Sequence, residues 1–370
     1  MGVAMSGSLQ VETIATDALS ESDRAAWLAL RAGDSRLESP YHHPDYHALV
    51  HAHQGGGRLS LVRRGGALVA LLPWQGGAFA RPSGAPMSDY QSVIGEALPV
   101  DTVLAGQAVG AFHYTAMPDP DGEATARIEI DTPDSWRDAQ GGSYRRHLKS
   151  TRRRIRKASE EIGEPRVVTQ SRDIDAYQAL MSWKREKFLE TGKYDVLANP
   201  GTSGLLRALW ERPVSAELRC DLHVLYFGNR IAACDLGLTD GRVFHSWIVG
   251  YDSALLPYAP GIQLLEGVVD ASEALGYRVI DLGPGLDGYK RHYASHPRHV
   301  GAGVVALPGA AGAIASAYSR AEDALRERTG DALGKVRRRY SQIAACEPSL
   351  SGRGRAMASA VSHRLRSRPA

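Results

Sequence analysis

Four side chains in the second half of the chain are of types that can give or take a proton. Asp235 lies among Ala, Cys, Leu and Gly in a predicted strand, where a carboxylate is disfavoured unless it is paired or functional. Asp281 lies in a later apolar strand, His245 alternates with apolar residues in the strand between them, and Tyr289 follows in a polar loop. A carboxylate or imidazole can act as a base and a phenol as an acid, although such histidines and tyrosines are also ordinary core residues.

The elements that position these groups are predicted between residues 241 and 293. Residues 242–251 are apolar on both alternating faces, which predicts a central strand buried on two sides. A loop with two prolines leads to apolar residues at helical spacing from Ile262 to Leu275, and Gly276 ends this helix. Residues 277–282 predict a second strand, followed by a loop that carries Tyr289 and Lys290.

The start of this helix is a candidate anion site. Backbone N–H groups at a helix N-terminus lack partners and carry partial positive charge. Gly261 adds no side chain there, which lets a phosphate approach the backbone. Since any strand–helix–strand crossover has such an end, the pattern alone does not separate a phosphate site from an ordinary crossover.

Length and composition indicate a globular protein. The 370 residues are enough for about two domains, each with its own core. The hydrophobic content of 43% and charged content of 23% are ordinary, and a net charge of +3 is too small to indicate nucleic-acid binding. No signal segment or long apolar run is evident, so we expect a soluble, cytoplasmic protein in which Cys220, Cys234 and Cys346 are reduced thiols.

The predicted elements divide the chain into four parts of an α/β (α+β) fold. Residues 1–10 are expected to be disordered, residues 11–135 form a first mixed domain, residues 143–310 form a second, and residues 311–370 form a helical, basic tail. The first domain is expected to hold helices at 20–32, 44–53 and 100–107 and strands at 59–62, 67–72, 111–116 and 126–130. A loop is expected at 74–89 and a linker at 131–142.

Polar residues in the first domain are candidates for substrate binding. Asp89, Tyr90 and Gln91 follow a loop rich in Gly, Pro and Ser, where short polar groups suit recognition of a sugar or peptide but also suit a turn. Nearby, His47 and His51 have the i, i+4 spacing that can hold zinc. No third ligand is evident close to them, so we expect no metal.

Residues 144–163 predict a strongly basic helix. Eight Arg and Lys residues fall between Arg145 and Lys157 without an acid, while Leu148, Ile155 and Ile162 recur every seven residues. This surface is either solvated or binds a polyanion such as cofactor phosphates, an RNA acceptor arm or an anionic substrate. No aromatic residues alternate with the arginines, which disfavours single-stranded nucleic acid.

Lys184 interrupts the apolar stripe of the helix predicted at 174–190. A lysine in this position either extends to solvent or binds a ligand, so we keep it as a candidate substrate-binding residue. Tyr251, at the end of the long strand, is a second such candidate and also a rival to Tyr289 as an acid. A helix at 203–210 and strands at 166–169, 222–227 and 231–238 complete the predicted elements before residue 241.

The order of these elements resembles a GNAT acyltransferase, and the details resemble its BioF2-like and CelD (BcsL)-like branch, related to the FemAB aminoacyl transferases. The resemblance covers roughly residues 20–310. The matching pieces are PMSDYQSVI (86–94), YRRHLKSTRRRIRK (144–157), WKREKFLETGKYDV (183–196), GNRIAACDLGL (228–238), WIVGYD (247–252), PGIQLLEGVVDASEALG (260–276) and DLGPGLDGYK (281–290).

The resemblance implies two tandem GNAT-like domains, with acyl-CoA held by the second. It implies donor contacts along the long strand and at the start of the following helix, from Trp247, Ile248, Val249, Pro260, Gly261, Ile262 and Lys290. The usual pyrophosphate loop of the family is Arg/Gln-x-x-Gly-x-Gly/Ala, whereas residues 256–261 here hold a single glycine and no basic residue. Lys290, Arg291 or the basic helix would then supply the missing charge.

An acyl transfer assigns roles to the titratable residues. An amine acceptor must lose a proton before it attacks a thioester, so Asp235, His245 and Asp281 are candidate bases. The leaving thiolate takes a proton either from water or from a tyrosine, for which Tyr289 is the candidate and Tyr251 its rival. Backbone N–H groups at a splayed strand end can stabilise the developing oxyanion.

The resulting hypothesis is an enzyme that transfers an acyl group, such as acetyl, from acyl-CoA to an amine or hydroxyl of a small polar acceptor. By resemblance, that acceptor is a sugar or polysaccharide precursor. A FemAB-like transferase that uses aminoacyl-tRNA to build a cell-wall precursor is one alternative. A GNAT-shaped binding protein without turnover is another.

Overall fold

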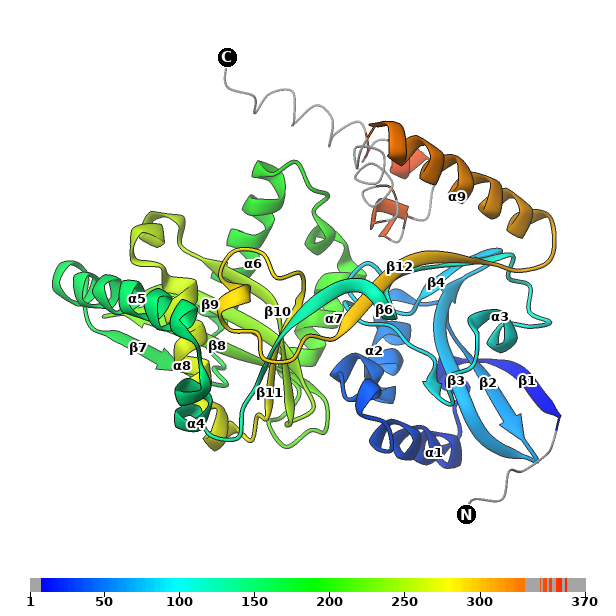
Figure 1. The fold of residues 1–370 in the computed structure, drawn as a ribbon, viewed down its shortest axis with the longest axis horizontal. Coiled ribbons are helices and arrows are strands. Elements are labelled where there is room, and N and C mark those ends of the chain that lie inside the picture. The colour runs from blue at the N-terminus through cyan, green and yellow to red at the C-terminus, as the bar shows by residue number, and fades with distance from the viewer. Residues whose placement is uncertain are drawn as a thin grey trace. The chain divides into compact units, whose positions relative to one another are not determined.

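The computed structural model describes residues 8–329, 340, 342–344, 346–347, 351–354 and 357, and they form two compact units (Figure 1). Unit 1 comprises Met1–Gly122, Gly192–Leu205 and Val300–Ala370, and unit 2 comprises Glu123–Thr191 and Leu206–His299. These units cross the expected boundaries, because residues 192–205 and the segment from Val300 onward join the N-terminal part. Most of the expected helical, basic tail beyond residue 329 lies outside the described part.

Unit 1 is built on an antiparallel hairpin extended at both edges. The strands run in the order β1, β2, β3, β4 and β6, with β5 paired to β3 and β12 to β6. The strands are β1 (Leu9–Ala15), β2 (Gly57–Arg64), β3 (Ala67–Gly76), β4 (Phe79–Pro82), β5 (Ile94–Gly95), β6 (Ala111–Glu129, which continues into unit 2) and β12 (His299–Ala306). The helices are α1 (Glu21–Ala32), α2 (Pro44–Gln54), α3 (Val100–Val103), α9 (Ala310–Thr329) and 3-10 turns at Thr16–Ala18, Ser35–Leu37, Pro40–His42 and Val196–Ala198.

Several expectations for the N-terminal part need correction. Leu9 and Gln10 are not disordered but begin β1, which pairs with β2, while residues 1–7 lie outside the described part. The expected loop at 74–89 contains the end of β3 and all of β4, which pair with each other. The two strands expected at 111–116 and 126–130 are one strand, β6, which continues through the proline-containing segment between them and pairs with β12.

Unit 2 is a mixed sheet flanked by helices. Its strands run in the order β6, β11, β10, β9, β8 and β7, and only β10 and β11 pair in parallel. The strands are β7 (Pro165–Val168), β8 (Arg219–Phe227), β9 (Arg230–Thr239), β10 (Val243–Tyr251) and β11 (Val279–Pro284). The helices are α4 (Pro133–Ala139), α5 (Gly142–Glu161), α6 (Ile174–Glu190), α7 (Pro200–Glu211, which begins in unit 1), α8 (Pro260–Leu275) and 3-10 turns η5 (Ser253–Tyr258) and η6 (Lys290–His292).

Helices α6 and α8 cover opposite faces of this sheet. Ala233 belongs to the core cluster that holds Leu264 and Val268 of α8. Its neighbour Cys234 points the other way, and its thiol lies 3.5 Å from the backbone carbonyl of Ala176 in α6. The mixed α/β fold with flanking helices is therefore confirmed, and it follows from strands that are apolar on both faces.

The linker expected at 131–142 also needs correction. It contains α4, which starts with a capping box in which Thr132 and Ser135 each accept a hydrogen bond from the other's backbone N–H. Trp136 of this helix is buried against Tyr144 and Tyr293, which fixes the segment to the core.

Candidate active site

Strands β10 and β11 separate in the middle of the sheet of unit 2. In the described part of the chain they pair only from Val243 with Val279 to His245 with Asp281, although β10 continues to Tyr251. On its other edge, β10 shifts register against β9 between Ser246 and Ile248, which leaves Trp247 as the extra residue of a bulge. The bulge turns the strand and breaks the simple alternation on which the sequence prediction for His245 rested.

Asp235 of β9 is a buried carboxylate that is only half satisfied. Its Oδ2 accepts a hydrogen bond from the Ser246 hydroxyl at 2.7 Å, while its Oδ1 is buried without a partner among the described residues. Burial raises the pKa of Asp235 to about 7, against the lowering effects of the Ser246 hydrogen bond and of the charges of His245 and Lys184. A carboxyl group with this pKa can accept a proton near neutral pH.

His245 and Asp281 form a second buried group beside it. Their closest nitrogen and oxygen atoms are 3.6 Å apart, and Asp281 also lies 3.7 Å from the guanidinium of Arg127 in β6. Burial alone would raise the pKa of Asp281, but His245, Arg127 and a 2.8 Å hydrogen bond from the Gly283 amide bring it below its ordinary value. The two aspartates therefore differ, since Asp281 stays ionised where Asp235 can be protonated.

Tyr289 and Lys184 belong to other elements but also lie near Asp235. Burial raises the pKa of Tyr289 to about 12, and the charge of Asp235 adds to this effect. Lys184 of α6 donates a hydrogen bond to the backbone carbonyl of Val249 at 3.4 Å, and its charge also acts on Asp235. A phenol with so high a pKa remains protonated at neutral pH and can give a proton.

The start of α8 offers one free backbone amide. Ala259, in a left-handed conformation, precedes the helix without a side-chain cap, and Pro260 has no N–H. The amides of Ile262 and Gln263 both donate to the Ala259 carbonyl, so that of Gly261 is left without a partner in the described chain. A Cβ atom at Gly261 would meet only Tyr251, at 3.7 Å, so the space beside the Gly261 Cα is open.

Other residues predicted to bind the donor, and Tyr251, predicted to bind the substrate, lie on or near the separated strands. Trp247 and Ile248 are buried, Tyr251 is partly exposed at its end, and Lys290 donates a hydrogen bond to the Pro284 carbonyl at 3.1 Å. The structure thus gathers Asp235, His245, Asp281, Tyr289 and Lys184 around the bulge.

The candidate residues Asp89, Tyr90 and Gln91 lie in unit 1. Two of them, Tyr90 and Gln91, are part of its packed interior. The Gln91 amide donates to Ser88 and Thr115 and accepts from the amides of Thr115 and Ala116, which uses all its polar groups. Tyr90 and Gln91 line a cavity of about 10 Å³, which holds no more than about one water molecule.

The predicted histidine pair does not gather metal ligands. Burial lowers the pKa of His47 to about 3, and no group of three or more His, Cys, Asp or Glu residues suited to a metal occurs in the part of the chain that the structure describes.

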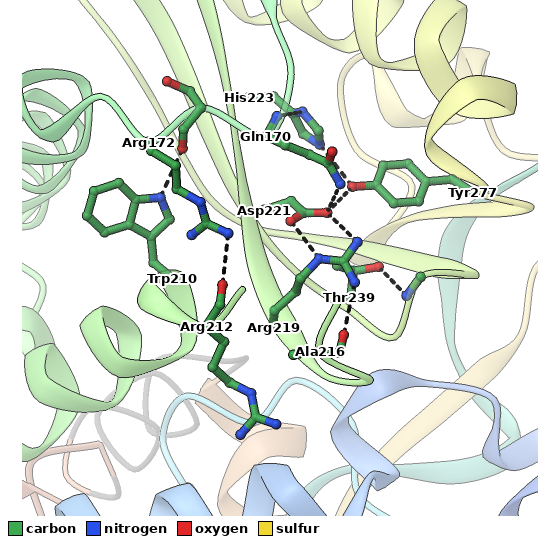
Figure 2. A network of polar contacts seen from close by, with 12 residues as sticks. Gln170, Arg172, Trp210, Arg212, Ala216, Arg219, Asp221, His223, Thr239 and Tyr277 are labelled. Atoms are coloured by element: carbon green, nitrogen blue, oxygen red, sulfur yellow. Dashed lines mark hydrogen bonds and ion pairs between the residues drawn. The ribbon is translucent and has the colours of Figure 1, made fainter. Parts of the chain in front are cut away.

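The structure contains a buried polar network on β8 that the sequence did not lead us to expect. Figure 2 shows Asp221 at the centre of this network. The Asp221 carboxylate accepts a bidentate pair of hydrogen bonds from the Arg219 guanidinium at 2.9 and 3.0 Å. It also accepts hydrogen bonds from the Tyr277 hydroxyl at 2.6 Å and from the Gln170 side-chain amide at 3.1 Å. The Tyr277 hydroxyl also lies 3.4 Å from His223, whose pKa burial lowers to about 4. The alternation Arg219, Asp221, His223 in an otherwise apolar strand is the signal that could have revealed it.

Sequence reasoning also missed Ser246 and Arg127. Residues 126–130 are apolar except for Arg127 and Glu129, and a buried arginine requires an acidic partner, so a pairing of Arg127 could have been anticipated. The contact from Ser246 to Asp235 depends on the bulge, which the sequence pattern does not show.

Comparisons with known proteins bear on this part of the chain. Residues 145–291 match the family model described as an acetyltransferase (GNAT) domain. No curated protein matches the chain. No helix among the described residues is long and apolar enough to cross a membrane.

Solved structures similar to the chain share little sequence with it. A tandem GNAT protein from the clavulanic acid biosynthesis pathway is 12% identical, with a TM-score of 0.45 over 82% of this chain and 100% of that one. FemX is 10% identical, with a TM-score of 0.49 over 80% and 97%. A conserved protein of unknown function from Bacteroides thetaiotaomicron is 10% identical, with a TM-score of 0.49 over 78% and 98%.

Proposed function

We propose that unit 2 transfers an acyl group, such as acetyl, from acyl-CoA to an amine or hydroxyl of a small polar acceptor. The observation that carries this proposal is Asp235, a buried carboxyl with a pKa of about 7 beside the point where β10 and β11 separate. The match of residues 145–291 to a GNAT acetyltransferase domain supports the reaction class. By resemblance, an amino sugar is the first acceptor to test.

In this proposal the donor thioester lies along the unpaired edge of β10. Its pantetheine arm follows Trp247, Ile248 and Val249, whose peptide groups no longer pair with β11. A phosphate meets the open amide of Gly261, with Pro260 and Ile262 shaping the turn around it. Backbone N–H groups at the bulge stabilise the negative charge that develops on the thioester oxygen.

Each titratable residue has a distinct task. Asp235 takes the proton from the acceptor as it attacks, because its pKa of about 7 places it near the working pH. Tyr289 gives its proton to the leaving thiolate. The His245 and Asp281 pair, held by Arg127, keeps a fixed charge beside Asp235 and positions the strand ends.

The acceptor approaches from the side of Lys184 and Tyr251. Lys184 is held by the Val249 carbonyl, so its charge lies close to the separated strand.

Thermal unfolding with and without millimolar acetyl-CoA tests the donor. If the dissociation constant is about 10 μM, a ligand concentration one hundred times higher raises the unfolding free energy by roughly 2.7 kcal/mol. This raises the unfolding temperature by a few degrees. Gly261→Glu should abolish the increase, whereas Gly261→Ala should keep it, because its methyl group makes only an ordinary contact with Tyr251. No increase with any acyl-CoA would overturn the donor assignment.

Release of thiol from acetyl-CoA tests turnover. A panel of amino sugars is incubated with the protein, and thiol is measured with a colorimetric reagent. Thiol release that depends on the acceptor supports the transferase. Binding of acetyl-CoA without turnover, unaffected by Asp235→Asn, supports a binding protein instead.

A further inference from the structure

The exposed surface of α5 is a continuous basic face. It consists of Arg145, Arg146, Lys149, Arg152, Arg153, Arg154, Arg156 and Lys157, all exposed. Among the described residues only Lys157 has an acidic partner on this helix, Glu161 at 3.8 Å, where both side chains are about half exposed. A surface with so many unneutralised charges favours an acidic partner.

The basic face ends beside the entrance to the donor site. Helix α5 packs on the 3-10 turn η5, which leads directly into α8, and Figure 1 shows α5 next to α8 and β7. The Tyr258 hydroxyl donates a 2.6 Å hydrogen bond to Glu161, and the Lys157 ammonium lies 5.7 Å from the centre of the Tyr258 ring. A partner bound to α5 therefore lies next to the start of α8.

The start of α8 suits one phosphate better than several. Gly261 supplies a single open amide, and residues 256–261 contain no basic side chain. Coenzyme A carries a pyrophosphate and a further phosphate on its ribose. A phosphopantetheine arm bound to a protein carries only one phosphodiester.

We propose that the basic face of α5 docks an acidic acyl carrier protein, whose phosphopantetheine arm enters the donor site at Gly261. This inference rests on the proposed acyl transfer and names the donor preferred over free acyl-CoA. The carbon–sulfur bond of the carrier thioester breaks, and a bond forms between the acyl carbon and the acceptor nitrogen or oxygen. Asp235 takes the acceptor proton, and Tyr289 protonates the thiolate left on the arm.

The same surface fits a protein better than RNA. Leu256 of η5 is 57% exposed, and an apolar side chain beside a charged face is typical of a protein interface. The only Phe, Tyr or Trp of α5, Tyr144, is buried, and the ring of His147 is stacked on that of His292, so the helix offers no exposed Phe, Tyr or Trp ring for base stacking.

Donor competition tests the inference with the full chain. Thiol release is measured with acetylated acyl carrier protein, acetyl-CoA and S-acetylpantetheine, which lacks both phosphate and protein. The carrier should have a KM at least tenfold below that of acetyl-CoA, and its KM should rise steeply with salt. The double variant Arg152→Glu, Arg153→Glu should raise the carrier KM at least tenfold while S-acetylpantetheine turnover changes less than twofold.

A single charge reversal elsewhere on unit 2 controls for nonspecific effects of reversing an exposed arginine. Arg242 is exposed in the turn between β9 and β10, so Arg242→Glu should leave all three donors unchanged relative to wild type. Equal use of carrier and acetyl-CoA, or equal losses for both in the α5 variant, would overturn the inference. Salt-sensitive binding of aminoacyl-tRNA that competes with the carrier would also overturn it. Failure of every donor, S-acetylpantetheine included, would instead reject the proposed acyl transfer.

Discussion

Two buried aspartates on neighbouring strands of unit 2 have opposite environments. Asp221 of β8 is bonded by Arg219, Tyr277 and Gln170, which together satisfy both its oxygens. Asp235 of β9 has one hydrogen bond, and its other oxygen is buried without a partner in the described chain. The strands are directly paired, with Asp221 opposite Gly237 and Asp235 opposite His223.

The difference is the one expected between a carboxylate that stabilises the fold and the one that we propose as the catalytic base. A carboxyl group whose oxygens are all hydrogen-bonded has no capacity left for a substrate proton. A half-bonded group with a pKa of about 7 carries an energetic cost and retains an open lone pair. Such a cost is expected to persist where function requires it.

The largest expected effect is on the rate of acyl transfer by Asp235→Asn. An amide cannot act as a base, so kcat/KM should fall by about two to four orders of magnitude. The fold should be retained, because Asn can still accept the hydrogen bond from Ser246. Steady-state thiol release measures the rate, and circular dichroism checks the fold. A loss below threefold would mean that Asp235 is not the base.

Asp221→Asn should act on stability instead. It leaves the buried Arg219 charge uncompensated, which costs roughly 3 to 5 kcal/mol of unfolding free energy. Urea denaturation measures the loss, and Asp235→Asn provides the comparison. If Asp221→Asn were as stable as wild type but inactive, the distinction between the two aspartates would fail.

The pH dependence of stability should differ between wild type and Asp235→Asn. The folded pKa of Asp235, about 7, lies above its ordinary value of 3.8, so the folded state holds an extra proton between these values. The cost of burying the charge is absent below about pH 4 and complete above about pH 7, where it amounts to about 4 kcal/mol at most. Wild type should therefore lose stability relative to Asp235→Asn as the pH rises through this window. Urea denaturation at pH 5 and pH 8 measures this difference in unfolding free energy between the two proteins. The same difference at both pH values would contradict the prediction.

The smallest expected effect is that of Ser246→Ala. The Ser246 hydroxyl lowers the pKa of Asp235, so its removal should raise that pKa further. Hydrogen bonds to charged groups contribute about 1.5 to 3 kcal/mol, and kcat/KM at pH 7 should fall roughly tenfold or more. Activity should recover at higher pH, unlike that of Asp235→Asn, and a pH-independent loss would point to a different role for the hydroxyl.

Sequence patterns predicted the elements around the site better than the contacts within it. Strands β8 to β11 and helix α8 were predicted because their apolar runs are long and end at glycines such as Gly276, whose φ of 78° suits a helix end. Asp235 stood out because a carboxylate is rare inside a strand. Its partner Ser246 is brought to it by a bulge, and the bonds of Asp221 join β8 to Tyr277 at the end of α8. Such contacts depend on tertiary packing, which local periodicity does not encode.

The pH dependence of kcat/KM for acetyl transfer is the sharpest test of Asp235 as the catalytic base. If Asp235 is the base, kcat/KM rises with pH to a plateau with an apparent pKa of about 7, and Ser246→Ala moves this pKa upward. The residual activity of Asp235→Asn should lack this dependence. A rise near pH 7 that persists in Asp235→Asn, or that Ser246→Ala leaves in place, would show that another group titrates and would contradict the assignment of Asp235 as the base.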